Sequence, residues 1–119
     1  MPAEEVPYLL APTEGWTGAL TADRASRLAE LHSDLIERDE RLRVLNEALA
    51  LLERDPEFHP ARVLEAQVRF LSGRYSMVVD RLEPVRQAAP GYVAAELLYA
   101  RTAEHLERPL QAFEAYWSV

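Results

Sequence analysis

The chain has 119 residues, a formal net charge of −7 and no cysteine. That length corresponds to one ordinary domain, which can bury a core without disulfides or metal ions. The negative charge argues against sequence-independent binding to nucleic acid, because such binding needs a basic patch. The lack of cysteine excludes a disulfide framework and thiolate chemistry.

The sequence contains no stretch that approaches the roughly 18 consecutive apolar residues of a transmembrane helix, so we expect no membrane insertion. The first residues, MPAEEVPYLLAPTEGW, lack the basic region and the long apolar run of a signal peptide. The localisation stays open between a soluble cytoplasmic protein and an exported protein whose leader has been removed.

The N-terminal residues 1–22 are predicted to be extended, because Pro7, Pro12, Gly15 and Gly18 disfavour a helix there. The same stretch carries large apolar side chains that a purely disordered tail would lack, namely Val6, Tyr8, Leu9, Leu10, Trp16 and Leu20. We therefore expect this segment to pack on the rest of the chain, either as a cap or by filling a groove.

Six helices are predicted to follow, because apolar residues recur at every third or fourth position. Pro56 and Pro90 mark the ends of the first two helix pairs, and Pro109 stands at the first turn of the last helix, where a proline loses no hydrogen bond. Pro84 is expected to kink the fourth helix or to shift its bonding. The predicted ranges are 23–37 and 40–53, 60–72 and 75–88, and 92–106 and 109–118.

The helix pairs repeat with a period of 34 residues, which separates Pro56 from Pro90. The phase is shared by the sets Val44, Val78 and Ala112, and Leu51, Val85 and Val119. This period resembles the tetratricopeptide repeat (TPR) family over residues 25–119, as repeats 25–58, 59–92 and 93–119. The resemblance implies an all-α fold, a right-handed solenoid of about three helical hairpins. Repeat two departs from the family pattern, with charged residues where large apolar ones are usual: Arg62, Glu65 and Arg69.

Enzymatic chemistry is not expected. His32, His59 and His105 fall in three different repeats without the spacing of metal ligands. The carboxylates stand at helix spacing from arginines, as Asp34 does from Arg38, which is typical of solvated ion pairs. The sequence has no glycine-rich phosphate loop and no nucleophile motif. We therefore predict no catalytic residue, no metal and no cofactor.

The family resemblance implies that the first helix of each hairpin lines a concave groove. One branch of the family binds a terminal carboxylate there with Lys and Asn, but the matching positions are Ala29 and Ser33, so that clamp is absent. An apolar groove for a peptide or a partner helix remains, unless the chain covers it itself. The candidate groove residues are Ala29, Ser33, Ile36, Val63, Gln67, Phe70, Leu97 and Arg101.

The last predicted helix, PLQAFEAYWSV, carries more apolar residues than one helix can bury against its own hairpin. Because a repeat array needs a polar terminal face, Phe113, Tyr116 and Trp117 are predicted to form a self-association surface. The expected function is a non-catalytic protein–protein interaction module that presents an apolar concave groove to a protein or peptide partner. The alternative is a structural or assembly module that mainly self-associates, as a homodimer, through its uncapped C-terminal helix.

Overall fold

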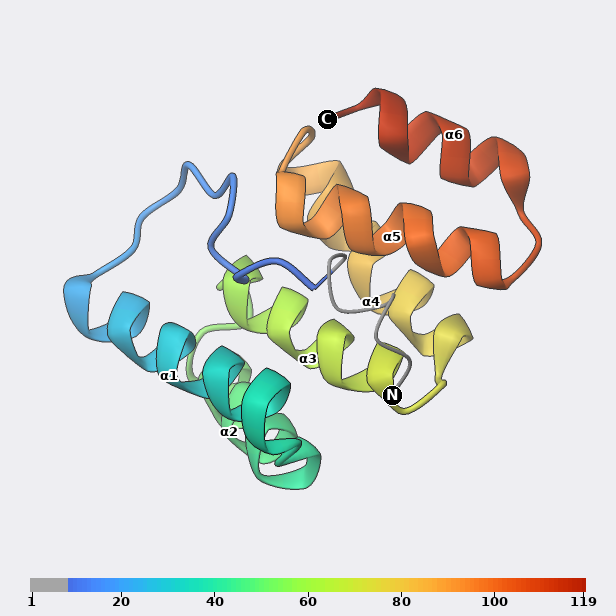
Figure 1. The fold of residues 1–119 in the computed structure, drawn as a ribbon. Helices are drawn as coiled ribbons and strands as arrows, with labels where there is room; N and C mark the ends of the chain where they lie inside the picture. Colours follow the sequence, from blue (N-terminus) through green and yellow to red (C-terminus); the bar gives the residue numbers. More distant parts are fainter. Residues whose placement is uncertain (1–8) are drawn as a thin grey trace.

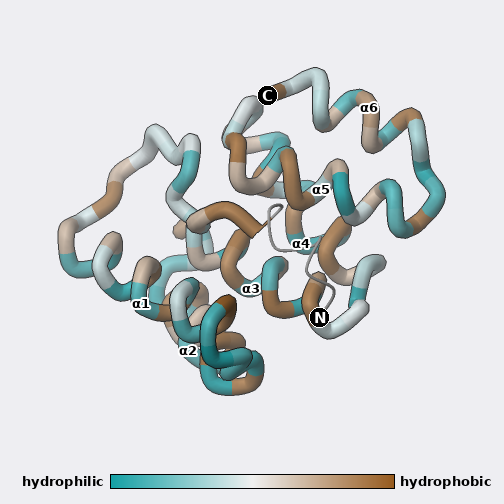
Figure 2. Tube along the Cα trace, viewed as in Figure 1, coloured by the Kyte–Doolittle hydropathy of each residue, from teal (hydrophilic) through white to brown (hydrophobic). Residues whose placement is uncertain are grey.

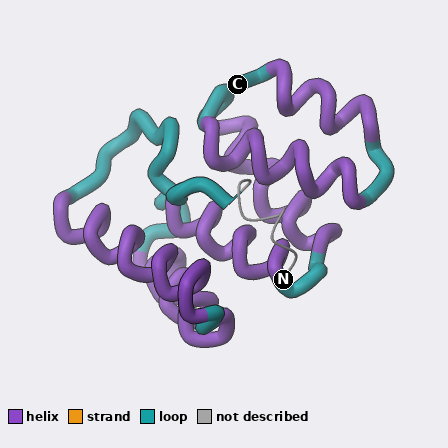
Figure 3. Tube along the Cα trace, viewed as in Figure 1, coloured by secondary structure: helices purple, strands orange, loops and turns teal. Residues whose placement is uncertain are grey.

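The computed structural model describes residues 9–119, so the predictions made for Val6 and Tyr8 lie outside the described residues. Within that range the chain forms six helices and no strand (Figures 1 and 3). Each helix begins and ends within one residue of its predicted boundary. The helices are α1 (Ala22–Arg38), α2 (Arg41–Arg54), α3 (His59–Leu71), α4 (Tyr75–Ala88), α5 (Val93–His105) and α6 (Pro109–Trp117).

The corner inside each helix pair has a left-handed backbone at the same repeat position. The φ angles are 54° at Asp39, 75° at Gly73 and 56° at Glu107. Glycine adopts this conformation at no steric cost, whereas aspartate and glutamate adopt it less readily. The same turn therefore recurs with the period of the sequence, whichever residue occupies it.

Each helix packs against the next one along the chain, and α3 also packs against both α1 and α5. This arrangement of adjacent helix pairs, with α3 at its centre, is consistent with a helical repeat (Figure 1). Hydrophobic stretches recur along α3, α4 and α5, where these helices meet (Figure 2). The core accordingly has two parts, one between α1, α2 and α3 and the other between α3, α4 and α5.

The charged residues of α3 form an ion cluster with α4. Glu65 is fully buried, and its carboxylate accepts from Arg62 at 3.3 Å and from Arg69 at 3.4 Å. The guanidinium of Arg81, on α4, lies 3.2 Å from the same carboxylate. A buried carboxylate is tolerated only when it is paired and hydrogen-bonded. These residues therefore join α3 to α4 where the family pattern would place apolar side chains.

Helix α4 continues from Tyr75 to Ala88 through Pro84, which lies on the exposed side of the helix. A proline removes one backbone hydrogen bond, and it is tolerated best where water can reach the carbonyl that loses its donor. Helix α4, which was expected to kink or to shift its bonding at Pro84, is therefore one uninterrupted helix.

Candidate functional site

The residues predicted to line the concave groove differ widely in exposure. On α3, Val63 and Gln67 are fully buried and Phe70 is 2% exposed. The positions on α1 and α5 are more open, because Ala29 is exposed and the half-buried residues are Ser33, Ile36, Leu97 and Arg101. Only the flanks of the predicted groove are therefore accessible, and its floor on α3 is covered.

The covering element is residues 9–16, named here the N-terminal segment, which crosses α3 between α1 and α5 (Figure 1). It was predicted to be extended, but residues 12–15 form turns, in which the N–H of Glu14 donates to the carbonyl of Ala11 at 2.9 Å. At its start, the ring Nε2 of His32 on α1 lies 2.9 Å from the carbonyl oxygen of Leu9. The side-chain amide of Gln67 on α3 donates to the carbonyl of Leu10 at 2.6 Å. Two of the helices thus hold the main chain of the segment rather than its side chains.

The other end of the segment is held by the beginning of α5. The buried hydroxyl of Tyr92 donates to the carbonyl of Pro12. The backbone N–H of Ala94, in the first turn of α5, donates to the carbonyl of Glu14 at 3.1 Å. An N–H in the first turn of a helix has no partner inside the helix, so the segment satisfies a donor that would otherwise need water.

Apolar contacts complete the attachment of the segment. Leu9 is 4% exposed and belongs to the same buried cluster as Val63 and Phe70. The ring of Trp16 lies edge-on to His59 at 5.7 Å and tilted against Tyr92 at 5.3 Å. The N-terminal segment is therefore a part of the core over α3 and α5.

Gly15 is required by the close approach of the segment to α5. Its φ angle is +81°, and a Cβ at this position would lie 2.6 Å from the backbone nitrogen of Val93. No side chain fits at that distance. The large apolar residues Leu9 and Trp16 predicted that this segment packs on the rest of the chain, but the sequence did not indicate which residues of α5 it contacts.

Burial favours the neutral form of the two titratable side chains that hold the segment, because it shifts the pKa of each. It lowers the pKa of His32, while the hydrogen bond to Leu9 opposes this shift. Because a carbonyl can only accept, the neutral ring must carry its proton on Nε2. Burial raises the pKa of the Tyr92 hydroxyl, which therefore stays protonated and donates. The Oε1 atom of Gln67 is buried without a partner.

The acidic side chain nearest to the start of α5 makes structural contacts. Among residues 9–119, no group of three or more His, Asp or Glu side chains is placed to hold a metal ion. The buried acid Glu96 accepts from Arg86 at 2.6 Å and from the backbone N–H of Gly91 at 3.3 Å, so its carboxylate stabilises the turn before α5. The guanidinium of Arg86 also lies over the ring of Tyr99 at 4.0 Å.

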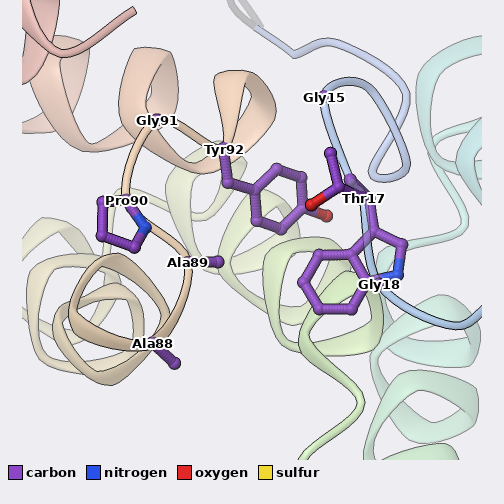
Figure 4. A pocket seen from close by; sticks show the side chains of 9 residues that line it. Gly15, Thr17, Gly18, Ala88, Ala89, Pro90, Gly91 and Tyr92 are labelled. Carbon is purple, nitrogen blue, oxygen red and sulfur yellow. The ribbon is translucent and has the colours of Figure 1, made fainter.

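A pocket of about 390 Å³ lies beside the segment, between residues 15–18 and residues 88–92 (Figure 4). Its walls are mainly glycine, alanine and proline, with no charged side chain. A second pocket, of about 450 Å³, lies between α2, α3 and α4. Two of its arginines are already engaged, Arg41 with the carbonyl of Leu71 and Arg69 with Glu65.

The predicted self-association residues lie on the outer side of α6. Phe113 is 62% exposed, Trp117 80% and Tyr116 37%, and the Tyr116 hydroxyl donates to Glu104. The rings of Phe113 and Trp117 are stacked, with centroids 5.9 Å apart. The inner side of α6 is formed by small residues, the buried Ala112 and Ala115. The aromatic side chains therefore face solvent.

None of the helices in the described part of the chain is long and apolar enough to cross a bilayer. Comparisons with protein-family models, with curated proteins and with solved structures found no match to this chain.

Proposed function

We propose that the chain is a non-catalytic protein–protein interaction module, built as a right-handed solenoid of about three TPR-like helical hairpins with an N-terminal segment packed across them. Two observations support this architecture. The left-handed corners at Asp39, Gly73 and Glu107 recur with the period of the sequence. The packing of α3 against both α1 and α5 puts the first helices of the three pairs side by side.

The interaction function rests on one observation, the capture of the N-terminal segment through its main chain, in which residues 12–15 form turns. Donors from α1, α3 and the start of α5 converge on carbonyl oxygens between Leu9 and Glu14. Main-chain hydrogen bonds supply affinity for a bound peptide, and side-chain pockets such as that of Leu9 supply selectivity. The proposed ligand is a protein segment that carries a leucine three positions before a proline, as Leu9 and Pro12 do, and that competes with residues 9–16 for the concave face.

The experiment is the binding of a fluorescent LLAPTEGWT peptide, measured by anisotropy, to the intact chain and to two variants. Leu9→Ser removes the buried anchor of the N-terminal segment, whereas Leu20→Ser changes a side chain that is 36% exposed. A tethered segment competes at an effective concentration in the millimolar range, so the wild type should bind the peptide weakly. Leu9→Ser should bind it at least tenfold more tightly, because burial of a leucine contributes about 1.5–3 kcal/mol.

Leu20→Ser should bind the peptide as weakly as the wild type does, and circular dichroism should give the same helix content for all three proteins. If the peptide binds none of the three proteins, the N-terminal segment is a fixed part of the fold and the groove has no ligand.

The alternative function is assembly of the chain with itself through α6. It is favoured by the outward position of Phe113 and Trp117, which are 62% and 80% exposed. Light scattering tests it on the wild type and on the double variant Phe113→Ser with Trp117→Glu. Under this alternative the wild type is dimeric at micromolar concentration and the double variant is monomeric with unchanged helicity.

A further inference from the structure

The second helices of the first two pairs carry an apolar stripe at three repeat positions. On α4 the stripe consists of Val79, Leu82 and Val85, and α2 has Leu45, Ala48 and Leu51 at the same positions of the period. The matching residues of the last repeat are named here the C-terminal stripe: Phe113 and Tyr116 on α6, and Val119, which lies two residues beyond the end of that helix.

The C-terminal stripe differs from the α4 stripe in burial, not in apolar character. On α4, Leu82 and Val85 are fully buried and Val79 is 7% exposed, because α5 packs against that helix. In the last repeat, Phe113 is 62% exposed and Val119 54%. Helix α6 lies at the opposite end of the stack from α1 and α2, where no further helix follows within the described residues (Figure 1).

The helices that cover the two inner stripes share one pattern. A small residue is followed by leucine three positions later and by a β-branched residue four positions after that. The small residue allows the two helices to approach closely, and the leucine fills the space between them. In α5 the hydroxyl of Thr102 donates to the carbonyl of Leu98, so its polar atom is satisfied. The three residues are Ala61, Leu64 and Val68 on α3, and Ala95, Leu98 and Thr102 on α5, each at most 2% exposed.

We propose that the C-terminal stripe docks a helix of a partner protein that carries this same spacing, Ala-x-x-Leu-x-x-x-Val/Thr, and that packs on α6 as α5 packs on α4. The spacing of the partner is inferred from the interfaces within the chain, because α3 packs on α2 and α5 packs on α4 with residues at this spacing. This inference rests on the proposed interaction function but concerns a surface separate from the concave face.

The first helix of a second copy cannot supply such a partner. The α1 positions that match the covering residues are Arg27, Glu30 and Asp34. They are engaged in ion pairs, since Arg27 lies 2.7 Å from Glu30 and 2.8 Å from Glu47, and Arg43 pairs with Asp34. The N-terminal end of the stack is therefore polar and the C-terminal end is apolar, so copies of the chain do not stack head to tail.

The probe is a fluorescein-labelled peptide of residues 91–106 of this chain. A hydrocarbon staple between positions 93 and 97 holds it helical, as checked by circular dichroism. Anisotropy measures its binding to the intact protein. The peptide should bind saturably to the wild type, and Phe113→Ser should weaken binding at least tenfold. Leu42→Ser, which changes a leucine that is 72% exposed on α2, should leave binding unchanged. A control peptide with Ala95→Glu and Leu98→Ser should not bind.

Three outcomes would overturn the inference. The first is a stapled peptide that shows no saturable binding in the micromolar range. The second is equal binding to the wild type and to Phe113→Ser, which would place the peptide elsewhere. The third is a wild type that is dimeric by light scattering and becomes monomeric on Phe113→Ser, which would identify a second copy as the occupant. Binding of LLAPTEGWT to the Leu9→Ser variant does not involve α6, so failure here is distinguishable from failure of the concave-face function.

Discussion

The ring Nε2 of His32 lies 2.9 Å from the carbonyl oxygen of Leu9, which joins α1 to a segment that precedes it in the chain. The imidazole is largely enclosed, and burial lowers its pKa below the ordinary value of 6.5. The folded protein therefore binds fewer protons at this site than the unfolded chain does. The contribution of this contact to stability therefore depends on pH.

Stability should fall as the pH drops below about 6.5, because the unfolded chain then takes up a proton that the folded ring resists. The loss continues until the pH passes the lowered pKa of the folded state, and above 6.5 the contribution is constant. The measurement is urea denaturation at pH 7.5 and pH 5 for the wild type and for His32→Gln, which keeps an N–H donor without titrating. The wild type should lose more stability than the variant over this interval. Equal losses would mean that other groups cause the acid sensitivity.

Gly15 should be far less tolerant of substitution than Gly73, although both have a left-handed backbone. At Gly15 a Cβ would meet the backbone of Val93 at 2.6 Å, whereas at Gly73 nothing lies within 4 Å. Gly73→Ala should cost only the strain of its φ angle, about 1 kcal/mol. Gly15→Ala should cost clearly more, because the N-terminal segment must also move away from α5. Thermal denaturation of the two variants provides the comparison, and equal losses would contradict the close approach at Gly15.

The helices could be predicted from the sequence because their signals are local. The apolar period and prolines such as Pro56, Pro90 and Pro109 fix where each helix begins and ends. The large apolar residues of the N-terminal segment predicted that it packs on the helices, but the residues that it contacts could not be predicted in this way. Leu9 packs with Val63 and Phe70, which lie more than 50 positions further along the chain, and no local pattern encodes such a contact.

The charged residues of repeat two illustrate the same limit. Their positions departed from the family pattern, but no local signal pairs Glu65 with an arginine of the following helix. The pairing becomes visible only when α3 and α4 are packed and Arg81 lies 3.2 Å from the carboxylate.

Glu65→Gln should destabilise the protein more than Glu30→Gln. The carboxylate of Glu65 is fully buried and faces three guanidinium groups, so its removal leaves the charges of Arg62, Arg69 and Arg81 without their partner. The expected loss is about 1–3 kcal/mol, since the arginines remain partly open to water. Glu30 also pairs with an arginine, but its side chain is 62% exposed and such pairs contribute little. Urea denaturation of both variants measures the difference in the free energy of unfolding. Equal losses would show that the buried cluster contributes no more to stability than an exposed ion pair does.

Ala100 should not accept a larger side chain, because it is fully buried where α5 meets its neighbours. Insertion of extra methylene groups into a packed core forces side chains off their rotamers or shifts the helices, at a cost of typically about 1–3 kcal/mol. Ala100→Leu should accordingly lower the melting temperature by several degrees, since about 1 kcal/mol shifts the midpoint of a domain of this size by roughly 4–8 °C. Ala50→Leu is the matched control, because the same change is made on the exposed side of α2. That control should melt within a degree or two of the wild type. If Ala100→Leu has the same melting temperature as the control, α5 can move away from its neighbours at little cost. In that case the close packing at Ala100 does not determine the spacing of the helices.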